Sequence, residues 1–521
     1  MERRTFIGGG AAAIAAVATA GCSGKSLGIG SGDTSTVANT SKTTGTGIGR
    51  LPAAAANWAA LARDLDGTLV RPGDASWKTA HQLYNTRFDN LKPAAVAYVA
   101  NADDIRSVLS YARAHSIKVA IRNGGHSYAG WSSGDNRLIV DVSKLNKIRA
   151  SGSTAVVGAG SKLIDVYRGL AAKGVTIPAG SCPTVGVSGL TLGGGHGVVS
   201  RAYGLTCDSL TQATLITADG KQLIANASEN KDLFWALRGA GNGNFGVVTE
   251  LQFKTHPAPQ AVSGYLTWPS SMAAAVVKAW QEWGPDQPDE IWSSCHLSNT
   301  PGGTPRVSVA AFSLGTYNEL QNAVDKLAHL VGGNASSVSL RRHTYKESME
   351  AYAGCSSFST DAQCHLPGTT PGRNPQGALS RETYTGRSDF FDRSISDAGI
   401  QTMLAQMRSV SGNGDIALTA LGGAVNRVSP TATAFVHRRS RMLAQYLVSW
   451  PAGTAGAAAQ SWLTRFHTAM KPYASGAAYQ NYTDPTLTDW RKAYYGDAAT
   501  RLTTLKKQYD PNHFFSYPQG L

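Results

Sequence analysis

Long apolar runs, zinc-binding spacings and internal repeats are all missing from this sequence. After the N-terminus, no segment approaches the roughly 18 consecutive apolar residues of a membrane span. The six cysteines and 12 histidines form no set with the spacing of a zinc site. Because no unit recurs along the chain, a solenoid or propeller is also excluded. The sequence therefore predicts a globular protein without a metal site.

Acidic residues are few, 34 against 48 lysines and arginines, so the formal net charge is +14. A basic protein can attract nucleic acid or another acidic polymer. Here the basic residues are scattered, and the densest clusters, at 341–343 and 437–441, are too short for a stripe that follows phosphates. The charge indicates a solvated surface, with attraction of anionic substrates or cell-wall polymers as the alternative. No nucleic-acid partner is expected.

The N-terminus has the features of an export signal. Arg3 and Arg4 precede a mild, Gly- and Ala-rich apolar stretch at 8–21, as in a Tat-type signal, which carries folded proteins across a membrane. We expect residues 1–22 to be this signal, with Cys22 lipidated after cleavage. The alternative is ordinary cleavage near Cys22 and a freely secreted protein. Residues 23–50, rich in Ser, Gly and Thr, are expected to form a flexible tether. The predicted location is extracellular, cell-surface or periplasmic.

Disulfides are possible in an exported chain. Cys355 and Cys364 lie close together in a region rich in Ser, Gly and Thr, which favours a local disulfide between them. Cys207 and Cys295 either pair with each other or stay buried and reduced, and the sequence does not decide between these two states.

A chain of 521 residues exceeds what one hydrophobic core usually supports, so two domains or one two-part domain are expected. The first domain is predicted over 51–258, with a core at 90–258 in which strands alternate with amphipathic helices. The expected strands are 94–99, 118–121, 138–142 and 155–159, and the expected helices are 103–115 and 164–173. The glycine-rich stretch 180–197 is expected to be an irregular, functional loop.

The composition changes near residue 259. Between 259 and 465, alternating segments at 307–312, 416–421 and 443–450 and a helical pattern at 318–330 predict an antiparallel sheet with helices on one face. We expect this second lobe to bind substrate. The last segment, 466–521, is predicted to contain a helix over 490–507 and to pack back on the first lobe. The predicted fold class is therefore α+β, with two lobes.

Two nucleophilic side chains lie beside glycines, which let backbone approach a ligand closely. His126 follows Asn123, Gly124 and Gly125, whose successive N–H groups can form a nest for a pyrophosphate. Cys182 opens a second stretch of this kind. Taken alone, His126 also fits an ordinary histidine beside a tight turn, and Cys182 also fits a buried structural thiol. Together they suggest a flavin held by two covalent bonds.

Six motifs follow one another in order along the chain. They are RNGGHSYAG at 122–130, CPTVG at 182–186, GGGHG at 193–197, DLFWALRG at 232–239, NFGVVT at 244–249 and YQNY at 479–482. On these motifs, residues 77–521 resemble the berberine-bridge-enzyme-like FAD-linked oxidases of the vanillyl-alcohol-oxidase superfamily, which have a PCMH-type FAD-binding domain. Many relatives have serine at the position of Asn123.

The resemblance implies that His126 bonds to the flavin 8α carbon and Cys182 to ring carbon 6. Such substituents strengthen the flavin as an oxidant, and two tethers hold it without a deep enclosing pocket, which predicts an open cleft. The other residues implied in cofactor binding are Arg122, Asn123, Gly124, Gly125, Ser127, Val185, Gly186, Gly193, Val248, Tyr479 and Asn481.

Tyr482 is implied to be the catalytic base, which takes the proton of a substrate hydroxyl as hydride leaves the adjacent carbon for the flavin N5. A phenol with a pKa of about 10 needs positive charge or hydrogen bonds that favour the phenolate, and the sequence does not show that partner. The alternative for Tyr482 is aromatic packing. Tyr479 and Asn481, expected on one side of the same strand, contact the flavin or orient Tyr482. Tyr128 either shapes the substrate side of the flavin ring or packs.

Some relatives have a second base on a strand just before a Gly-Gly pair. The equivalent segment here, 418–423, has no carboxylate or tyrosine, which weakens mechanisms that need two bases, such as the oxidative cyclisation of amines. In relatives, the residue three positions after the tethering cysteine governs the access of oxygen to the flavin, and the resemblance implies that the small Val185 at this position allows it. This residue favours an oxidase that releases hydrogen peroxide over a dehydrogenase.

The implied protein is an exported, monomeric oxidase with bicovalent FAD that acts on a hydroxyl of a carbohydrate, such as an oligosaccharide, or of a similar alcohol. Its electron acceptor is expected to be O2. The alternatives are a tailoring oxidoreductase for a secondary metabolite and a dehydrogenase with another acceptor. A binding protein that keeps the flavoprotein fold without turnover is disfavoured, because it needs neither the two tethers nor Tyr482.

Overall fold

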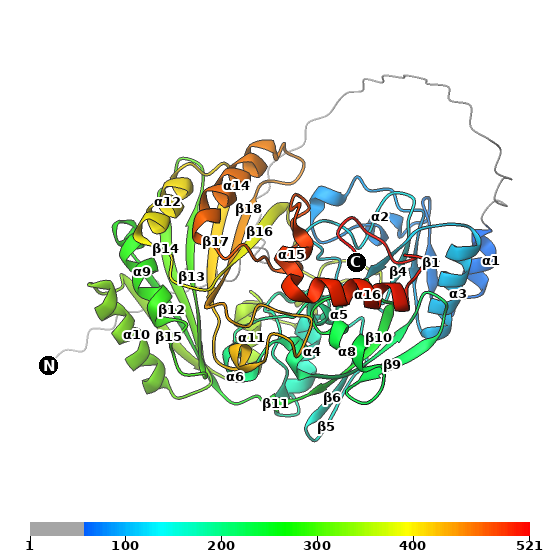
Figure 1. The fold of residues 1–521 in the computed structure, drawn as a ribbon, viewed down its shortest axis with the longest axis horizontal. Coiled ribbons are helices and arrows are strands. Elements are labelled where there is room, and N and C mark those ends of the chain that lie inside the picture. Colours follow the sequence, from blue (N-terminus) through cyan, green and yellow to red (C-terminus); the bar gives the residue numbers. More distant parts are fainter. Residues whose placement is uncertain (1–56) are drawn as a thin grey trace.

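Two lobes make up residues 57–521, the part of the chain that the computed structural model describes (Figure 1). The first lobe combines the N-terminal half of this part with the C-terminal helices, and the second lobe is formed by the residues between them. The expected signal, the tether and Cys22 lie outside the described residues. Within residues 57–521, none of the helices has both the length and the apolar character of a membrane span.

A four-stranded sheet in the order β1-β2-β4-β3 begins the first lobe. Its strands are β1 (Thr68–Val70), β2 (Ala95–Tyr98), β3 (Val119–Arg122) and β4 (Leu138–Asp141). β2, β4 and β3 are parallel and buried at nearly every position, which explains their continuous apolar sequences. The helix α3 (Ala102–Ala114) buries Ile105, Val108, Leu109 and Ala112, which share one face at helical spacing. The predicted strands and helix of this region are confirmed.

A five-stranded antiparallel sheet in the order β5-β6-β10-β8-β9 completes the first lobe. Its strands are β5 (Ile148–Ser151), β6 (Thr154–Gly158), β8 (Leu210–Ile216), β9 (Gln222–Asn226) and β10 (Val247–Lys254). The longer helices of this region are α4 (Leu163–Ala171) and α8 (Lys231–Leu237). Its shorter elements are α1 (Trp58–Arg63), α2 (Trp77–Ala80), α6 (Ser200–Tyr203), α7 (Thr206–Ser209), β7 (Val175–Thr176) and β11 (His256–Pro257).

The stretch 180–197, expected to be irregular throughout, contains a short helix, α5 (Val187–Leu192). That expectation was wrong for these six residues. Val187, Thr191 and Leu192 are buried on one side of the helix, and this burial outweighs the cost of about 1 kcal/mol for the internal Gly189. The rest of the stretch is loop, as predicted.

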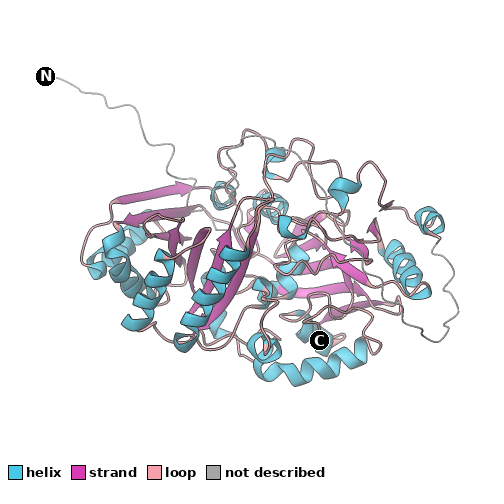
Figure 2. Cartoon of the chain, turned by 90° about the horizontal axis from the view of Figure 1, so that it is seen from above, coloured by secondary structure: helices cyan, strands magenta, loops and turns pink. Residues whose placement is uncertain are grey.

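Seven antiparallel strands form the sheet of the second lobe, in the order β15-β12-β14-β13-β17-β18-β16. They are β12 (Ala261–Trp268), β13 (Ile291–Asn299), β14 (Arg306–Ser313), β15 (Ser337–His343), β16 (Tyr384–Phe391), β17 (Asn413–Ala420) and β18 (Met442–Ser449). One face is covered by α9 (Ala273–Trp283), α10 (Tyr317–Val331), α12 (Asp397–Arg408) and α14 (Ala457–Met470), as Figures 1 and 2 show. The predicted α+β fold, with helices on one face of this sheet, is confirmed.

From α15 (Trp490–Tyr495) onward the last segment lies against the first lobe, whereas residues 466–470 complete α14 on the sheet of the second lobe. The segment contains α15 and α16 (Ala499–Tyr509), so the single helix expected over 490–507 was wrong. The chain turns at Gly496, whose φ of 45° favours glycine. The Lys506 ammonium donates to the carbonyl oxygens of Asn244 and Phe515 at 2.6 and 2.8 Å and lies 2.7 Å from the Asp510 carboxylate. This buried cluster fastens the C-terminal segment to the loop before β10.

The cysteines follow two different patterns. Cys355 and Cys364 form a disulfide, with their Cα atoms 5.6 Å apart, which confirms the predicted local pair. Cys207 and Cys295 are both buried and have no disulfide bond. Of the two states that the sequence left open for them, the structure therefore has the reduced one.

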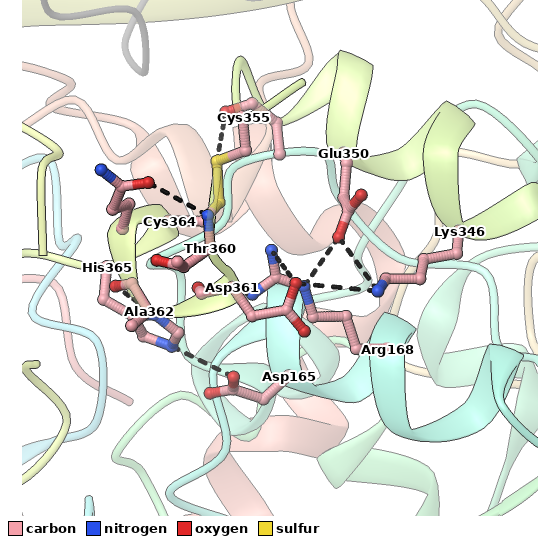
Figure 3. A network of polar contacts seen from close by, with 12 residues as sticks. Asp165, Arg168, Lys346, Glu350, Cys355, Thr360, Asp361, Ala362, Cys364 and His365 are labelled. Atoms are coloured by element: carbon pink, nitrogen blue, oxygen red, sulfur yellow. Dashed lines mark hydrogen bonds and ion pairs between the residues drawn. A yellow bond between two sulfur atoms is a disulfide. The ribbon is translucent and has the colours of Figure 1, made fainter. Parts of the chain in front are cut away.

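The disulfide-bonded loop is one junction between the lobes (Figure 3). It follows α11 (Tyr345–Tyr352), which packs against α4. The Arg168 guanidinium on α4 lies 2.9 Å from the Glu350 carboxylate on α11, and the Asp165 carboxylate lies 3.1 Å from the His365 imidazole. The junction is therefore polar and held by ion-paired side chains from both sides.

Arg201 on α6 forms a second, fully buried junction. Its side chain reaches into the second lobe and is 1% exposed. The guanidinium donates to the main-chain carbonyl oxygens of Pro285 and Ile291, at 2.8 and 2.9 Å, and of Gln287 and Leu421. One cation therefore satisfies carbonyl groups at the start of β13, just after β17 and in the loop between α9 and β13.

Candidate active site

A cavity of about 380 Å³ lies between the two lobes. The first lobe contributes loop residues around 123–128 and 180–190, the second lobe contributes its sheet, and the C-terminal segment contributes 479–483. Most of the predicted site residues line it: Asn123, Gly124, Gly125, His126, Ser127, Tyr128, Cys182, Val185, Gly186, Val248, Tyr479, Asn481 and Tyr482. Arg122 and Gly193 do not. The structure thus brings residues from three distant parts of the sequence to one site.

The loop after β3 presents unused backbone donors. From Asn123 to Ala129, no backbone N–H donates a hydrogen bond to another residue of the described part of the chain. Each N–H group that is buried without a partner lowers the free energy of unfolding by about 1–3 kcal/mol. Successive N–H groups that point into one cavity are a binding site for an anion. The loop therefore fits the pyrophosphate of a dinucleotide cofactor.

The loops that carry His126 and Cys182 touch each other. A Cβ atom on Gly124 would lie 2.4 Å from the Gly186 nitrogen and 2.6 Å from the Thr184 carbonyl oxygen, so a larger residue does not fit there. This close approach places both predicted attachment residues on the wall of the same cavity.

His126 is held in a fixed orientation. Its Nε2 atom lies 2.8 Å from the Thr184 hydroxyl, and its ring stacks on the Tyr84 ring with centroids 4.0 Å apart. Burial, and then the positive charge of Lys162, lower the pKa of His126 to about 3. The imidazole is therefore neutral at physiological pH, which is the form that acts as a nucleophile.

The two predicted residues that do not line the cavity support it from behind. The Arg122 guanidinium is paired with the Asp141 carboxylate, and both side chains are buried. Gly193 packs so closely on Asn481 that a Cβ atom there would lie 2.0 Å from the amide oxygen. In the structure Arg122 and Gly193 therefore contact residues around the cavity, and the cofactor contact predicted for them stays a prediction.

The YQNY segment is a tight turn, and the strand expected for it was wrong. Residues Gln480–Tyr482 form a 3-10 helix, with the Tyr482 N–H donating to the Tyr479 carbonyl at 2.9 Å. Residues three apart meet in such a turn, so the Tyr479 and Tyr482 rings lie 5.0 Å apart. Asn481 donates to the Tyr479 hydroxyl at 2.8 Å. Asn481 thereby orients Tyr479, which borders Tyr482.

Tyr482 is surrounded by aromatic rings, and within residues 57–521 no charged side chain shifts its pKa. Its ring stacks on Tyr128 with centroids 5.3 Å apart, and its hydroxyl lies 2.7 Å from His196 Nε2. Burial, and then the neighbouring Tyr128 and Tyr479 hydroxyls, raise the pKa of Tyr482 well above its usual value. Burial also lowers the pKa of His196 to about 4. At physiological pH the site therefore contains a neutral phenol hydrogen-bonded to a neutral imidazole.

The sheet contributes neutral hydrogen-bonding groups to the cavity. Gln445, Ala417 and His296 are neighbours across β18, β17 and β13, and all three line the cavity. Gln445 donates to the Tyr128 hydroxyl, and His296 Nδ1 lies 3.4 Å from an Asp415 carboxylate oxygen. The small Ala417 separates two polar side chains, so a ligand ring above it can hydrogen-bond on both sides.

Aromatic rings border this polar surface. Trp292 lines the cavity and packs edge-on against Tyr352, with ring centroids 6.2 Å apart. The Trp292 indole N–H is buried and has no hydrogen-bond partner among the described residues. A buried donor of this kind calls for a partner, which a ligand with an oxygen acceptor supplies.

Several of these residues had no role assigned from the sequence. His196 and Thr184 lie inside the GGGHG and CPTVG motifs, so the sequence contained a signal for a role of both residues. Gln445, His296 and Trp292 lie on strands of the second lobe without a motif. Only the register of the seven-stranded sheet brings them to the cavity.

Comparisons with known proteins cover nearly the whole described chain. A family model described as "FAD binding domain" matches residues 93–226, and one described as "Berberine and berberine like" matches residues 478–521. The chain is 31% identical over 464 residues to the uncharacterized FAD-linked oxidoreductase YgaK of Bacillus subtilis, which spans 88% of this chain and 97% of that protein. The first matched range contains the backbone donors at 123–129 and both His126 and Cys182. These donors fit the pyrophosphate of FAD.

Solved structures match to a similar extent. BBE-like 1 of Physcomitrella patens superposes with a TM-score of 0.81 at 30% identity, covering 89% of this chain and 98% of that one. The xylooligosaccharide oxidase from Myceliophthora thermophila, solved in complex with xylobiose, superposes with a TM-score of 0.77 at 28% identity, covering 89% and 99%.

Proposed function

The chain belongs to the berberine-bridge-enzyme-like family of FAD-linked oxidoreductases, and we propose that it oxidises a hydroxyl of a carbohydrate or similar alcohol, with O2 as electron acceptor. The observation that carries this proposal is the position of Tyr482. Its hydroxyl lies in the wall of a cavity that combines the FAD-binding loops with a sheet of neutral polar side chains. A proton acceptor beside a hydride acceptor is what the oxidation of an alcohol requires.

The proposed substrate is uncharged and rich in hydroxyl groups. Of the described residues that line the cavity, Arg137 is the only Lys, Arg, Asp or Glu, so neither an amine nor a carboxylate finds a charged partner among the groups around Tyr482. Gln445, His296 and the Trp292 indole offer hydrogen bonds beside aromatic faces, which suits a sugar ring. The related xylooligosaccharide oxidase binds xylobiose, which supports a short oligosaccharide as substrate.

The roles of the cavity residues follow from their positions. Bound FAD supplies the acceptor for the hydride. We assign covalent attachment to His126 and Cys182, anion binding to the backbone at 123–129, and proton removal to Tyr482. Val185, next to the attachment loop, is small enough to leave oxygen access, which supports release of hydrogen peroxide.

Oxidation of a substrate panel tests this function. Oxygen uptake and peroxide formation are measured with neutral mono- and oligosaccharides, glycosides of polyketides, and benzylisoquinoline amines. Turnover is expected with the sugars. Oxidation of the glycosides alone identifies a tailoring enzyme, flavin reduction without peroxide identifies a dehydrogenase, and no reduction of the flavin by any alcohol contradicts the proposal.

Flavin attachment provides a second prediction. Acid-precipitated protein should stay yellow, because covalent bonds survive unfolding. Cys182→Ala should shift the absorption spectrum, while the bond to His126 still retains the flavin. His126→Ala should also shift the spectrum, while the bond to Cys182 retains the flavin. Peptide mapping should find a flavin mass on the peptides of both residues. A colourless precipitate, or a Cys182 peptide joined to another cysteine, would contradict the two-bond attachment.

We also propose export by the Tat-type signal, with a lipid anchor at Cys22. The support is the paired Arg3 and Arg4 before a short apolar stretch. In the substrate experiment, peroxide-forming activity is therefore measured separately in cytoplasmic, membrane and extracellular fractions. Activity confined to the cytoplasm would refute export, and activity in the membrane fraction would favour the lipid anchor over free secretion.

A further inference from the structure

We propose that His196 accepts the phenol proton of Tyr482 while Tyr482 takes the proton of the substrate hydroxyl. This inference rests on the proposed alcohol oxidation and adds a second residue to its proton path. It follows from the one direct polar contact that the structure gives the Tyr482 hydroxyl, to His196 Nε2 at 2.7 Å. The two rings meet edge to face, at 85°, with centroids 5.7 Å apart.

The backbone on both sides of His196 is fixed. The Gly195 N–H donates to the Tyr479 hydroxyl at 2.8 Å, and the Gly197 N–H donates to the Ser200 hydroxyl at 2.8 Å. Tyr479 thus holds the loop of His196 and lies in the same tight turn as Tyr482. The imidazole and the phenol are therefore positioned by one set of contacts, which preorganises the pair for proton transfer.

Tyr482 needs such a partner because no other described residue beside it stabilises a phenolate. The ionisable groups that face it are Tyr128 from the loop after β3, Tyr479 from its own turn and Tyr384 on β16. Tyr128 and Tyr479 raise the pKa of Tyr482, and Tyr482 in turn raises the pKa of Tyr384, so none of the three stabilises a phenolate. Around His196, burial is the single cause that lowers its pKa to about 4, and no charged residue contributes. A neutral imidazole that accepts the phenol proton lets Tyr482 act without first ionising.

The proton balance is complete. The substrate O–H proton moves to the Tyr482 oxygen and the phenol proton moves to His196 Nε2, while FAD, held by the loops at 123–129 and 182–186, would supply the acceptor for the hydride of the adjacent carbon. A carbonyl product, a neutral phenol and an imidazolium result. The proton on His196 then joins the molecular oxygen that receives the same electron pair, and together with the hydride it yields hydrogen peroxide. The alcohol is oxidised and oxygen is reduced, with no other co-reactant.

The other ring nitrogen of His196, Nδ1, determines the tautomer in which Nε2 can accept the phenol proton. Nε2 can accept a proton when Nδ1 carries the hydrogen. Nδ1 is buried and has no hydrogen-bond partner among the described residues, and His196 lines the cavity. An Nδ1–H group therefore calls for an acceptor atom in the molecule that fills the cavity. Binding of that molecule would hold the tautomer that the proton transfer requires.

His196→Gln tests the proposal, because glutamine keeps a hydrogen-bonding amide but cannot take the proton. Anaerobic flavin reduction by the substrate is followed against pH. The wild-type rate should be level from neutral pH down to about 4, where His196 becomes protonated, and should fall below that pH. In His196→Gln the rate at pH 7 should drop about 10²-fold and rise with pH, since only the phenolate can then act.

His437→Gln is the matched control. His437 is also a buried histidine whose pKa is lowered to about 4, with burial as the largest cause. Its Nε2 atom lies 3.0 Å from the Tyr494 carbonyl oxygen. The control should therefore keep the wild-type pH profile even if its stability falls. A flat profile with a wild-type rate in His196→Gln would overturn the proposal, and so would a rising profile in both variants.

Nitrogen NMR of histidine-labelled protein gives an answer that does not depend on turnover. The His196 signals are identified by their absence from His196→Gln. The proposal requires a neutral ring with hydrogen on Nδ1 and an Nε2 shift that reports an accepted hydrogen bond, which Tyr482→Phe should remove. Hydrogen on Nε2 would overturn it. If no alcohol reduces the flavin, the proposed function fails by the substrate panel, while this spectrum still decides the pairing.

Discussion

Tyr482→Phe is expected to slow anaerobic reduction of the flavin by about 10³-fold, the range of an intact general base. The substitution removes the hydroxyl that contacts His196 and keeps the ring that stacks on Tyr128. Substrate affinity should change little, because the polar groups of the sheet remain. The loss should therefore appear in the limiting rate of reduction, measured by stopped-flow absorbance, and much less in the substrate concentration at half-saturation.

A matched control separates chemistry from packing. Tyr473 lies among the helices on the other side of the seven-stranded sheet, with its hydroxyl 3.4 Å from that of Thr402. Tyr473→Phe removes the same atom away from the cavity and should reduce the flavin at the normal rate. A near-normal rate in Tyr482→Phe would remove this residue as the base and leave His196 as the group to be examined in its place.

Lys506→Met is expected to lower the free energy of unfolding by about 3–5 kcal/mol. The Lys506 ammonium and the Asp510 carboxylate are each 1% exposed in their side chains. Methionine fills a similar volume but leaves the Asp510 charge and two main-chain carbonyl groups without their cation. The loss should be visible as a lower midpoint of denaturant unfolding, and 479–482 should become accessible to protease first.

Two further variants show whether charge is the cause. Lys507→Met makes the same change on the exposed side of α16 and should alter stability by about 0.5 kcal/mol or less. Lys506→Met combined with Asp510→Asn removes both charges and should recover part of the loss, since no unpaired charge stays buried and the single amide oxygen can still accept from the Phe514 or the Phe515 N–H group. Equal losses in the single and double variants would show that volume, not charge, decides.

The sequence predicts elements whose burial pattern is simple. The parallel strands β2, β3 and β4 appear as apolar runs, and α3 appears as apolar positions at helical spacing, because in both cases one physical requirement sets the pattern. Where two requirements compete, the sequence is misleading. Glycines around 180–197 conceal α5, whose formation depends on buried neighbours that are distant in sequence, and a single glycine at 496 divides an otherwise helical segment.

The candidate site also combines residues that the sequence predicted with residues that it did not. His126, Cys182 and Tyr482 belong to motifs and were predicted to share a site, and they line one cavity. The partner of Tyr482 was missed although His196 was visible in a motif, because no local pattern states that residues 286 positions apart lie in contact. The groups on β13 and β18 reach the cavity through strand register, which single-sequence periodicity does not specify.

The buried contacts of Arg201 limit how the two lobes can move. Separating them would expose a guanidinium and several carbonyl groups that now satisfy each other, at a cost of several kcal/mol. Opening and closing of the two lobes during turnover is therefore unfavourable. We expect substrates to enter and leave a cavity whose shape stays nearly constant.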